Sequence, residues 1–518
     1  MDRASTDEIF AVHAAIRVHE LGIESIDITI QNLLRQVQQL RTKRAHHLDA
    51  IAKCRGSISL AWRAPDDVLA LIFEHCAASG WANAPLIASH VCSKWRRASF
   101  SPRVWSHIYL TNDSLDPVAK TRLWLSRALQ SPLRITVGVQ VLDPYLLNAF
   151  DLILDHASQW RTLTLTTRFV QQAVDVLTPC RRTIPRLRSL DITSFSIGVA
   201  TEQGVDELAE LEDAFANAPS LTHVRIVCNR FPPSLPGAVV DLSLELTDIP
   251  SSRPSLSGAL QMLATLPALK SLKLKIPTYF AQILDNTGNP ALGIELHTLE
   301  RLIIDAPPDF NEVLQYIRAP ALRFLHLRST EPPLNHPHGG TGEALLQFLK
   351  SSEPSIELLE LHDVDIRRDD FVQCFSLLPL LEELRLHETE IPNDALFALH
   401  APTGSCPRLK RVDLRWCEQL AGQALVDLVQ SRSDFSIYQR TRFDPIEKIT
   451  VINCALVDES SVLDLAHATV CSVVVRNSED HCHSRGCCNN ARYRQRLRLR
   501  HQKDLGSSER SKMKLVLD

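Results

Sequence analysis

The chain has 518 residues and a mass of 58.1 kDa, which corresponds to about three and a half domains of roughly 150 residues each. Apolar residues make up 45% and charged residues 22%, a globular balance that excludes wholesale disorder and a collagen-like chain. The net charge of −4 excludes attraction to nucleic acid or membrane through bulk charge, and 17 glycines leave little material for glycine-rich phosphate loops.

The sequence carries no membrane or export signal. No window approaches the roughly 18 consecutive apolar residues that span a bilayer, and the start MDRASTDEIF lacks the basic-then-apolar order of a secretory signal. The 13 cysteines include no CxxC pair, so we expect most of them to be reduced and buried. These features predict a cytoplasmic or nuclear protein without a membrane partner.

Residues 1–58 are predicted to form a long helix with a heptad repeat. Counting in sevens gives two mostly apolar rows, at positions 9, 16, 23, 30, 37, 44 and 51 and at positions 12, 19, 26, 33, 40, 47 and 54. This spacing makes one apolar seam along a helix and favours a left-handed supercoil. Two outcomes are open: self-association through residues 9–54, or a helix that folds back on the following domain.

Two or three short helices are predicted between residues 59 and 112. Pro65 is expected at the first helical position, and apolar residues follow it at helical spacing: Val68, Leu69, Ile72 and Phe73. The segment 86–110 again has helical spacing, with a break at a Ser-Pro step. About fifty residues bury little core of their own, so large apolar side chains in such a unit often face a partner.

This segment resembles the F-box, in the form common in fungal F-box proteins. The family pattern is Leu-Pro-x-Glu, a helix ending in Ile-Phe, then Val-Cys-x-x-Trp-Arg and a final Trp. Here it reads APDDVLALIF, then VCSKWR from Val91 to Arg96, then VW at 104–105, with Ala64 and Asp67 in place of the usual Leu and Glu. The alternative is a plain helical hairpin.

The resemblance implies binding to the Skp adaptor of cullin-RING ubiquitin ligases. The residues expected to bind this adaptor are Pro65, Val68, Leu69, Ile72, Phe73, Val91 and Trp95. Trp95 and Trp105 are also expected to hold the small domain together, because an indole buries a large area.

Residues 113–478 are predicted to form an irregular leucine-rich-repeat solenoid. Segments such as PRLRSLDI, PALKSLKL and PLLEELRL recur, and their first apolar residues lie at 187, 221, 239, 269, 299, 322, 356, 381, 409, 446 and 470. The mean spacing of about 28 residues lies in the leucine-rich-repeat range. The fold class is therefore α/β: a long N-terminal helix, a small helical F-box-like domain and a solenoid with a parallel concave sheet.

Two repeats carry a cysteine, Cys417 or Cys454, in the turn after the strand. They resemble the cysteine-containing leucine-rich repeats often found behind F-boxes. We interpret both as buried structural thiols, because no His or basic residue lies at a fixed offset from them.

Residues between the inward leucines face out from the concave sheet and form the expected binding surface. Eight are basic and four acidic, so this surface is predicted to prefer an acidic segment of a partner, the alternative being an ordinary solvated sheet face. The residues expected to bind the target protein are Arg301, Phe324, His326, Arg328, Arg385, Arg411 and Arg415. The other outward residues are Lys273, Lys275, Asp305, Glu360, His362, Glu383, His387, Asp413 and Lys448.

Catalytic and metal-binding motifs were sought without success. GxxxxGK[ST], GxGxxG and GxSxG are all missing, and His387 in HETE lacks the second His of a zinc-protease helix. The His and Cys residues between 481 and 488 have the ligand types of a zinc site but the spacing of no familiar finger. We therefore expect no enzyme activity, no cofactor and no metal site.

Residues 479–518 form a basic tail, with ten Lys or Arg against two acidic residues between positions 485 and 514. A disordered, solvated tail is the expectation, with RNA binding, membrane contact and nuclear import as alternatives. Nucleic acid is not expected as a main partner of the protein.

Together these features predict an F-box adaptor of an SCF-type ubiquitin ligase. The F-box-like domain would bind the Skp adaptor and through it a cullin, and the repeats would hold an unknown target protein. The alternative is a non-catalytic coiled-coil and leucine-rich-repeat scaffold that engages no ligase.

Overall fold

The structure is a computed structural model. It describes residues 6–181, 184–194, 215, 218–228, 232, 234–247, 256–276, 293–329, 340–364, 366–417, 419–438, 443–454 and 456–474. The predicted tail of residues 479–518 lies outside these ranges. The chain divides into two compact units, Met1–Val104 and Trp105–Asp518, and each is described by itself.

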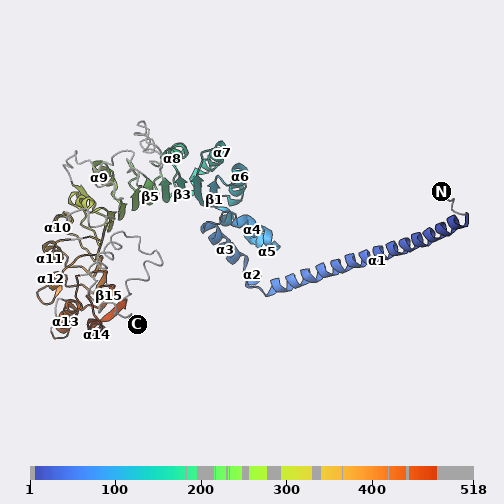
Figure 1. Ribbon diagram of the computed structural model, residues 1–518. Helices are drawn as coiled ribbons and strands as arrows, with labels where there is room; N and C mark the ends of the chain where they lie inside the picture. The colour runs from blue at the N-terminus through green and yellow to red at the C-terminus, as the bar shows by residue number, and fades with distance from the viewer. Residues whose placement is uncertain are drawn as a thin grey trace, which may run out of the picture. The chain divides into compact units, whose positions relative to one another are not determined.

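The first unit is entirely helical (Figure 1). Its helices are α1 (Thr6–Ile58), α2 (Leu60–Arg63), α3 (Asp66–Ala78), α4 (Ala84–Val91) and α5 (Ser93–Ser99), followed by the 3-10 turn η1 (Pro102–Trp105) at the boundary. The long helix predicted for residues 1–58 is confirmed. Its seam side chains are exposed.

Side-chain caps separate the short helices of this unit. Ser59 precedes α2 and its hydroxyl accepts a hydrogen bond from the backbone N–H of Trp62 at 3.1 Å. Pro65 directly precedes α3 instead of occupying its first position. The extended residue Cys92 caps α5, where its Sγ accepts from the N–H of Trp95 at 3.5 Å. This cap explains why Cys and Trp are spaced by three residues in VCSKW.

The second unit is built on a sheet of 14 strands, and every neighbouring pair is parallel. In order across the sheet, the strands are β1 (His107–Thr111), β2 (Leu133–Val139), β3 (Trp160–Thr167), β4 (Ser189–Ser194), β5 (His223–Cys228), β6 (Asp241–Leu246), β7 (Ser271–Lys275), β9 (Arg301–Ala306), β11 (Phe324–Ser329), β12 (Leu358–His362), β13 (Glu383–His387), β14 (Arg411–Arg415), β15 (Lys448–Ile452) and β16 (Val470–Val474). Two short strands, β8 (Ile294–Glu295) and β10 (Ile317–Arg318), pair separately.

Helices return the chain from one strand to the next on the outer side of this unit, and the strands line its inner side (Figure 1). The helices are α6 (Pro117–Ala128), α7 (Pro144–Leu154), α8 (Val170–Leu177), α9 (Leu256–Ala264), α10 (Thr341–Ser352), α11 (Arg368–Ser376), α12 (Asn393–Leu396), α13 (Gly422–Tyr438) and α14 (Glu459–Ala468). Shorter 3-10 segments are η2 (Ala157–Gln159), η3 (Thr178–Arg181), η6 (Pro308–Tyr316) and η7 (Phe397–Leu399). The predicted fold class, a leucine-rich-repeat solenoid with a parallel concave sheet behind a long helix, is confirmed.

The leucine spacing predicted the strands closely. From position 187 to position 446, each strand begins two residues after the predicted apolar residue, while β16 begins at position 470 itself. Buried residues alternate with less buried ones along the strands, as a sheet with one core-facing side requires.

The first strand corrects the sequence analysis. β1 begins inside segment 86–110, which had helical spacing, and lies inside the range 59–112 assigned to the F-box-like domain. Its sequence HIYLT is rich in residues that favour strands, and it pairs in parallel with β2. The solenoid therefore begins before residue 113.

None of the helices in the described part of the chain combines the length and the apolar character that a membrane span requires.

A left-handed residue follows four successive strands. Asp363, Glu388, Trp416 and Asn453 come directly after β12, β13, β14 and β15, with φ between 54° and 59°. This conformation turns the chain sharply away from the sheet although none of the four residues is glycine.

The two predicted cysteines come next in the chain after such residues. Cys417 Sγ donates to the carbonyl of Leu386 on the preceding strand at 3.2 Å, and Cys454 Sγ lies 3.8 Å from the carbonyl of Leu414. Both side chains are buried. Their interpretation as buried structural thiols is confirmed.

A buried arginine holds the loops near the C-terminal end of the solenoid. Arg432 on α13 is fully buried, and its guanidinium donates to five backbone carbonyls. The acceptors are Leu399 at 2.9 Å, Cys406 at 3.0 Å, Ser405 at 3.1 Å, Leu409 at 3.3 Å and Asp444 at 3.4 Å. Burial lowers the pKa of Arg432 to about 10, so the side chain keeps its charge at neutral pH.

Replacing Arg432 should destabilise this end of the solenoid strongly. Arg432→Met removes the five donors, and of the five carbonyls Cys406 keeps a backbone partner, the N–H of Leu409, so we expect a loss of about 3 to 5 kcal/mol in the free energy of unfolding. Arg432→Lys should recover little, because one ammonium cannot replace a five-donor fork. Urea denaturation followed by circular dichroism measures the loss. The exposed Arg408→Met is the matched control, with a change within about 0.5 kcal/mol.

Candidate functional site

The helical unit has a compact core and an apolar surface, and these two sets of residues alternate along α3. Leu69 and Phe73 are 1% and 3% exposed, whereas Val68 and Ile72 are 40% and 48% exposed. The Phe73 ring packs against Trp95, with 5.0 Å between the ring centroids. An ion pair between Asp66 and Arg97 ties the start of α3 to α5.

This division corrects the predicted adaptor-binding set. Leu69 and Phe73 fill the core, so in this structure they offer no surface to a partner, and Trp95 is half-buried against Phe73. The remaining members of the predicted set are exposed: Pro65, Val68, Ile72 and Val91. Three further apolar side chains on the same two helices are exposed and lie outside the predicted set: Leu71, Leu86 and Ile87.

The concave sheet carries its polar side chains in rows, because the parallel register sets equivalent residues of neighbouring strands side by side. From β11 to β14 the first row is Phe324, Leu358, Glu383 and Arg411. The middle row is His326, Glu360, Arg385 and Asp413. The last row is Arg328, His362, His387 and Arg415. Cationic and anionic groups therefore lie on adjacent strands.

Glu360 is the centre of the middle row. It is only 3% exposed, and both of its oxygens have hydrogen-bond partners. Oε1 accepts from Arg328 Nε at 2.9 Å, while Oε2 lies 3.0 Å from His326 Nδ1 and accepts from Arg385 Nη1 at 3.4 Å. Burial alone would raise the pKa of this carboxyl, but the His326 hydrogen bond and the Arg328 guanidinium hold it far below its ordinary value.

Two further carboxylates, Glu383 and Asp413, form ion pairs with the other arginines of the predicted target-binding set. Glu383 accepts from Arg411 Nε at 2.8 Å and from Arg385 Nε at 2.5 Å. Asp413 accepts from Arg415 Nε at 2.9 Å and Nη2 at 2.8 Å. Burial alone would raise the pKa of both carboxyls, but the guanidinium groups hold each pKa below its ordinary value.

The predicted target-binding residues therefore fall into two groups. Arg301 on β9 is exposed, and its guanidinium lies over the Phe324 ring, 4.9 Å from the centroid. The other five belong to the ion-pair network: His326, Arg328, Arg385, Arg411 and Arg415. Glu360, Glu383 and Asp413 are already among the predicted outward residues, and the structure adds that they form ion pairs with the arginines of this group.

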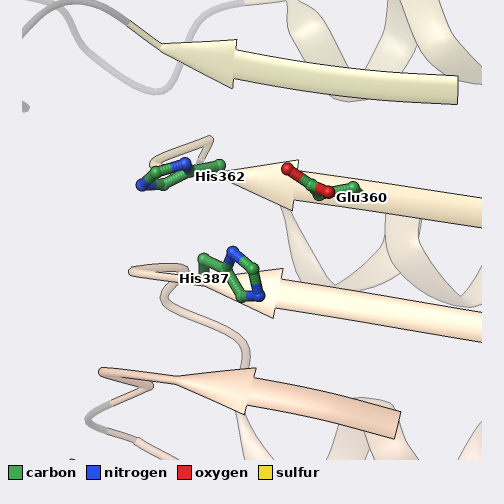
Figure 2. Close-up of side chains that lie close together, drawn as sticks. All are labelled: Glu360, His362 and His387. Atoms are coloured by element: carbon green, nitrogen blue, oxygen red, sulfur yellow. The ribbon is translucent and has the colours of Figure 1, made fainter. Parts of the chain in front are cut away.

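Two imidazoles of the last row and the Glu360 carboxylate of the middle row form a cluster of metal-ligand types that the sequence did not place in one site. Glu360, His362 and His387 each offer one ligand atom, and these atoms lie within 4.8 Å of one another, on two neighbouring strands (Figure 2). A carboxylate also lies beside each imidazole. Glu388 Oε1 is 3.5 Å from His362 Nε2, and Asp413 Oδ1 is 3.5 Å from His387 Nε2. Zn²⁺ accepts two imidazoles and a carboxylate.

The contacts of Glu360 nevertheless favour an ion-pair network over a metal site. A carboxylate has about four acceptor positions, and here Arg328, Arg385 and His326 already engage both oxygens. A dication would have to displace a guanidinium and would then face its positive charge at close range. We therefore treat this cluster as part of the polar concave surface.

Sequence analysis placed the network residues on the concave face but did not select Glu360, His362 or His387 as functional. The signal was present in the repeats themselves. Aligned on their leucines, the segments LHLR, LELH and LRLH give one column of His, Glu and Arg and a second of Arg, His and His. Reading columns across repeats, rather than each repeat alone, would have found the cluster.

Comparisons with known proteins add little to this description. No protein-family model matches the chain, and no curated protein matches it. Of 53 matching chains of solved structures, one is the leucine-rich repeat-containing protein LegL7 from Legionella pneumophila. It is 18% identical, the match covers 54% of this chain and 90% of that chain, and the TM-score is 0.26. At that score the likeness carries no argument, and the fold rests on the strand pairing described above.

The core and surface positions of α3 should respond differently to truncation. Leu69→Ala should lower the free energy of unfolding of the helical unit by about 2 to 5 kcal/mol, because it leaves a cavity beside the core. Ile72→Ala, one turn further along, should cost under about 1 kcal/mol, because its side chain is already half exposed. Thermal and urea unfolding of both variants measures the difference. Equal losses would contradict the division into core and surface.

Removing the charge of Glu360 should destabilise the solenoid in a pH-dependent way. Glu360→Gln leaves Arg328 without its carboxylate and leaves Arg385 with Glu383 alone, and we expect a loss of about 3 kcal/mol at neutral pH. The pKa of Glu360 is lowered by folding, so its contribution is present above the unfolded value of about 4.3 and is lost as the pH falls further. Urea unfolding of both proteins from pH 7 to pH 3 measures this. A difference that does not shrink below about pH 4.3 would contradict the assignment.

Proposed function

We propose that this chain is an F-box substrate-recognition adaptor of a cullin-RING, SCF-type ubiquitin ligase. The helical unit would bind a Skp-type adaptor, and through it a cullin, while the concave face of the solenoid would hold a target protein. The chain would position the target, and partner subunits would transfer ubiquitin. Its place of action would be the cytoplasm or the nucleus.

One observation carries the first half of the proposal. The helical unit fills its core with Leu69, Phe73 and Ala77, and still exposes apolar side chains on α3 and α4. The exposed set is Val68, Leu71, Ile72, Leu86, Ile87 and Val91. Apolar side chains gathered on so small a unit are characteristic of a protein-binding surface. The ordered F-box pattern on the same helices supports a Skp-type adaptor as the partner.

The concave face supports the second half. The arginines of the network each donate one or two N–H groups to a carboxylate, and a guanidinium has five. Arg328, Arg385 and Arg411 remain partly exposed, so their other N–H groups can serve a bound peptide. Arg301 and Phe324 add an aromatic contact beside them. A polar, charge-balanced surface of this kind suits a target segment that presents both acceptors and donors.

Three buried thiols of the solenoid are poorly suited to nucleophilic catalysis. Burial raises the pKa of Cys180, Cys374 and Cys406 to about 12 each, so these thiols stay protonated at neutral pH. Cys417 Sγ donates a hydrogen bond to the backbone carbonyl of Leu386. This supports the proposal that the chain itself performs no transfer step.

A second candidate is a scaffold that engages no ligase. It is favoured by α1, whose exposed apolar seam is a surface for assembly separate from the F-box-like helices. The two candidates differ in one measurable property, the affinity of the helical unit for a Skp-type adaptor.

Binding of the full chain to a purified Skp-type adaptor tests the proposal. The variant Val68→Asp/Ile72→Asp places charges on the exposed face of α3 without touching the core, and it should weaken binding at least tenfold. The matched control is Phe397→Asp/Leu463→Asp, which puts two charges on exposed apolar positions of the solenoid and should bind like wild type. Calorimetry measures affinity, and circular dichroism confirms folding. Failure of the folded wild type to bind would leave the scaffold as the function.

A further inference from the structure

The longest helix of the protein presents an apolar stripe to solvent. Ten seam side chains of α1 are between 43% and 64% exposed. They are Ile9, Val12, Ile16, Ile23, Ile26, Ile30, Leu33, Val37, Leu40 and Ile51. Most of the stability of a helix in a protein comes from packing its apolar face, so this stripe needs a partner along its whole length.

The charges of α1 are divided between its two halves. Residues 6–30 carry five acidic residues and one arginine, whereas residues 31–58 carry six Lys or Arg and one aspartate. Two such helices side by side in the same direction would place like charges together. In opposite directions, each acidic half would lie along a basic half, which is the attractive arrangement.

The seam itself matches a second copy in the opposite direction. In the register where paired residue numbers add to 63, every residue of one heptad row meets a residue of the other row, as antiparallel packing requires. The pairs are 9 with 54, 12 with 51, 16 with 47, 19 with 44, 23 with 40, 26 with 37 and 30 with 33. Each pair occurs twice because a two-fold axis relates the copies, so all fourteen layers of the seam are filled between residues 9 and 54.

Polar seam residues also distinguish the two directions. In a parallel, in-register pair, Arg44 would face Arg44 of the second copy across the seam, which places two like charges in one buried layer. In the antiparallel register Arg44 faces His19, whose neutral ring nitrogen can accept a hydrogen bond from it. The residues beside the seam also favour the antiparallel register, because Glu20 and Asp27 then lie near Arg41 of the second copy.

We propose that α1 pairs antiparallel with α1 of a second copy of this chain, with residue 9 opposite residue 54. The occupant of the seam is thus the protein itself. The paired segment of 46 residues is about 69 Å long at 1.5 Å per residue, and it places the two helical units at opposite ends. This inference does not rest on ligase function, since the α1 seam and the exposed residues of α3 and α4 are different surfaces.

Oligomeric mass tests the pairing on the full chain. Light scattering after size exclusion should give twice 58.1 kDa for the wild type at micromolar concentration. Ile23→Gln/Ile30→Gln, on the seam, should shift the protein to monomer at the same concentration. Leu21→Gln/Ile28→Gln changes two exposed apolar residues of similar size on the opposite side of the helix and should leave the dimer intact. A monomeric wild type, or a seam variant that stays dimeric, would overturn the proposal.

Crosslinking through Cys54 tests the direction. In the antiparallel register, oxidised Ile9→Cys should form a disulfide between the introduced thiol and Cys54 of the other copy. The two positions are about 69 Å apart within one helix, so this link can form only between chains. Peptide mapping by mass spectrometry identifies the joined residues.

The same chemistry gives the opposite result for a parallel pair. Wild type would then link Cys54 to Cys54, and Ile9→Cys/Cys54→Ser would link its two introduced thiols. Either product as the main species would overturn the antiparallel arrangement, whereas neither forms in the register proposed here.

Discussion

The parallel register of neighbouring strands is the constraint on which the solenoid depends. The strand of a single repeat has polar side chains on one face and leucines on the other. The repeat alone leaves these leucines exposed, and they become buried only when the next repeat stacks beside it. From β11 to β14 the inward residues pair leucine against leucine or valine, as in Leu325, Leu359, Leu384 and Val412. The same register that aligns the core also aligns the outward side chains, and the charged network is a consequence of it.

That network shows how a sheet face can hold charge at low cost. Burying Glu360 alone would be expensive, because a carboxylate loses its hydration in the interior. Two strands supply the compensation: His326 and Arg328 come from β11 and Arg385 from β13. The result is a network on β11 to β14 in which each arginine has a carboxylate partner. Under the proposed function, recognition of a target by these residues would depend on geometry and on the remaining N–H donors more than on attraction at a distance.

Much of the fold could be predicted, because an inward residue must be apolar in every repeat and this requirement is visible as spacing. The strand β1 was missed, since HIYLT follows a helical segment without the Pro-x-Leu lead of the later repeats. Helical spacing alone could not show that Leu69 is buried and Ile72 is exposed. The side of α3 that faces the core is set by the packing of Trp95 against Phe73. The five carbonyls around Arg432 belong to loops whose backbone paths leave no pattern in the sequence.

The central position of Glu360 has a consequence for how such a chain can change over generations. Its hydrogen-bond partners at positions 326, 328 and 385 belong to the two neighbouring repeats, so no one of these repeats holds a complete set of charges. A substitution at position 326, 360 or 385 changes a hydrogen bond that a neighbouring repeat shares. The three repeats from β11 to β13 are therefore one electrostatic unit and cannot be exchanged as independent modules without loss of these pairs.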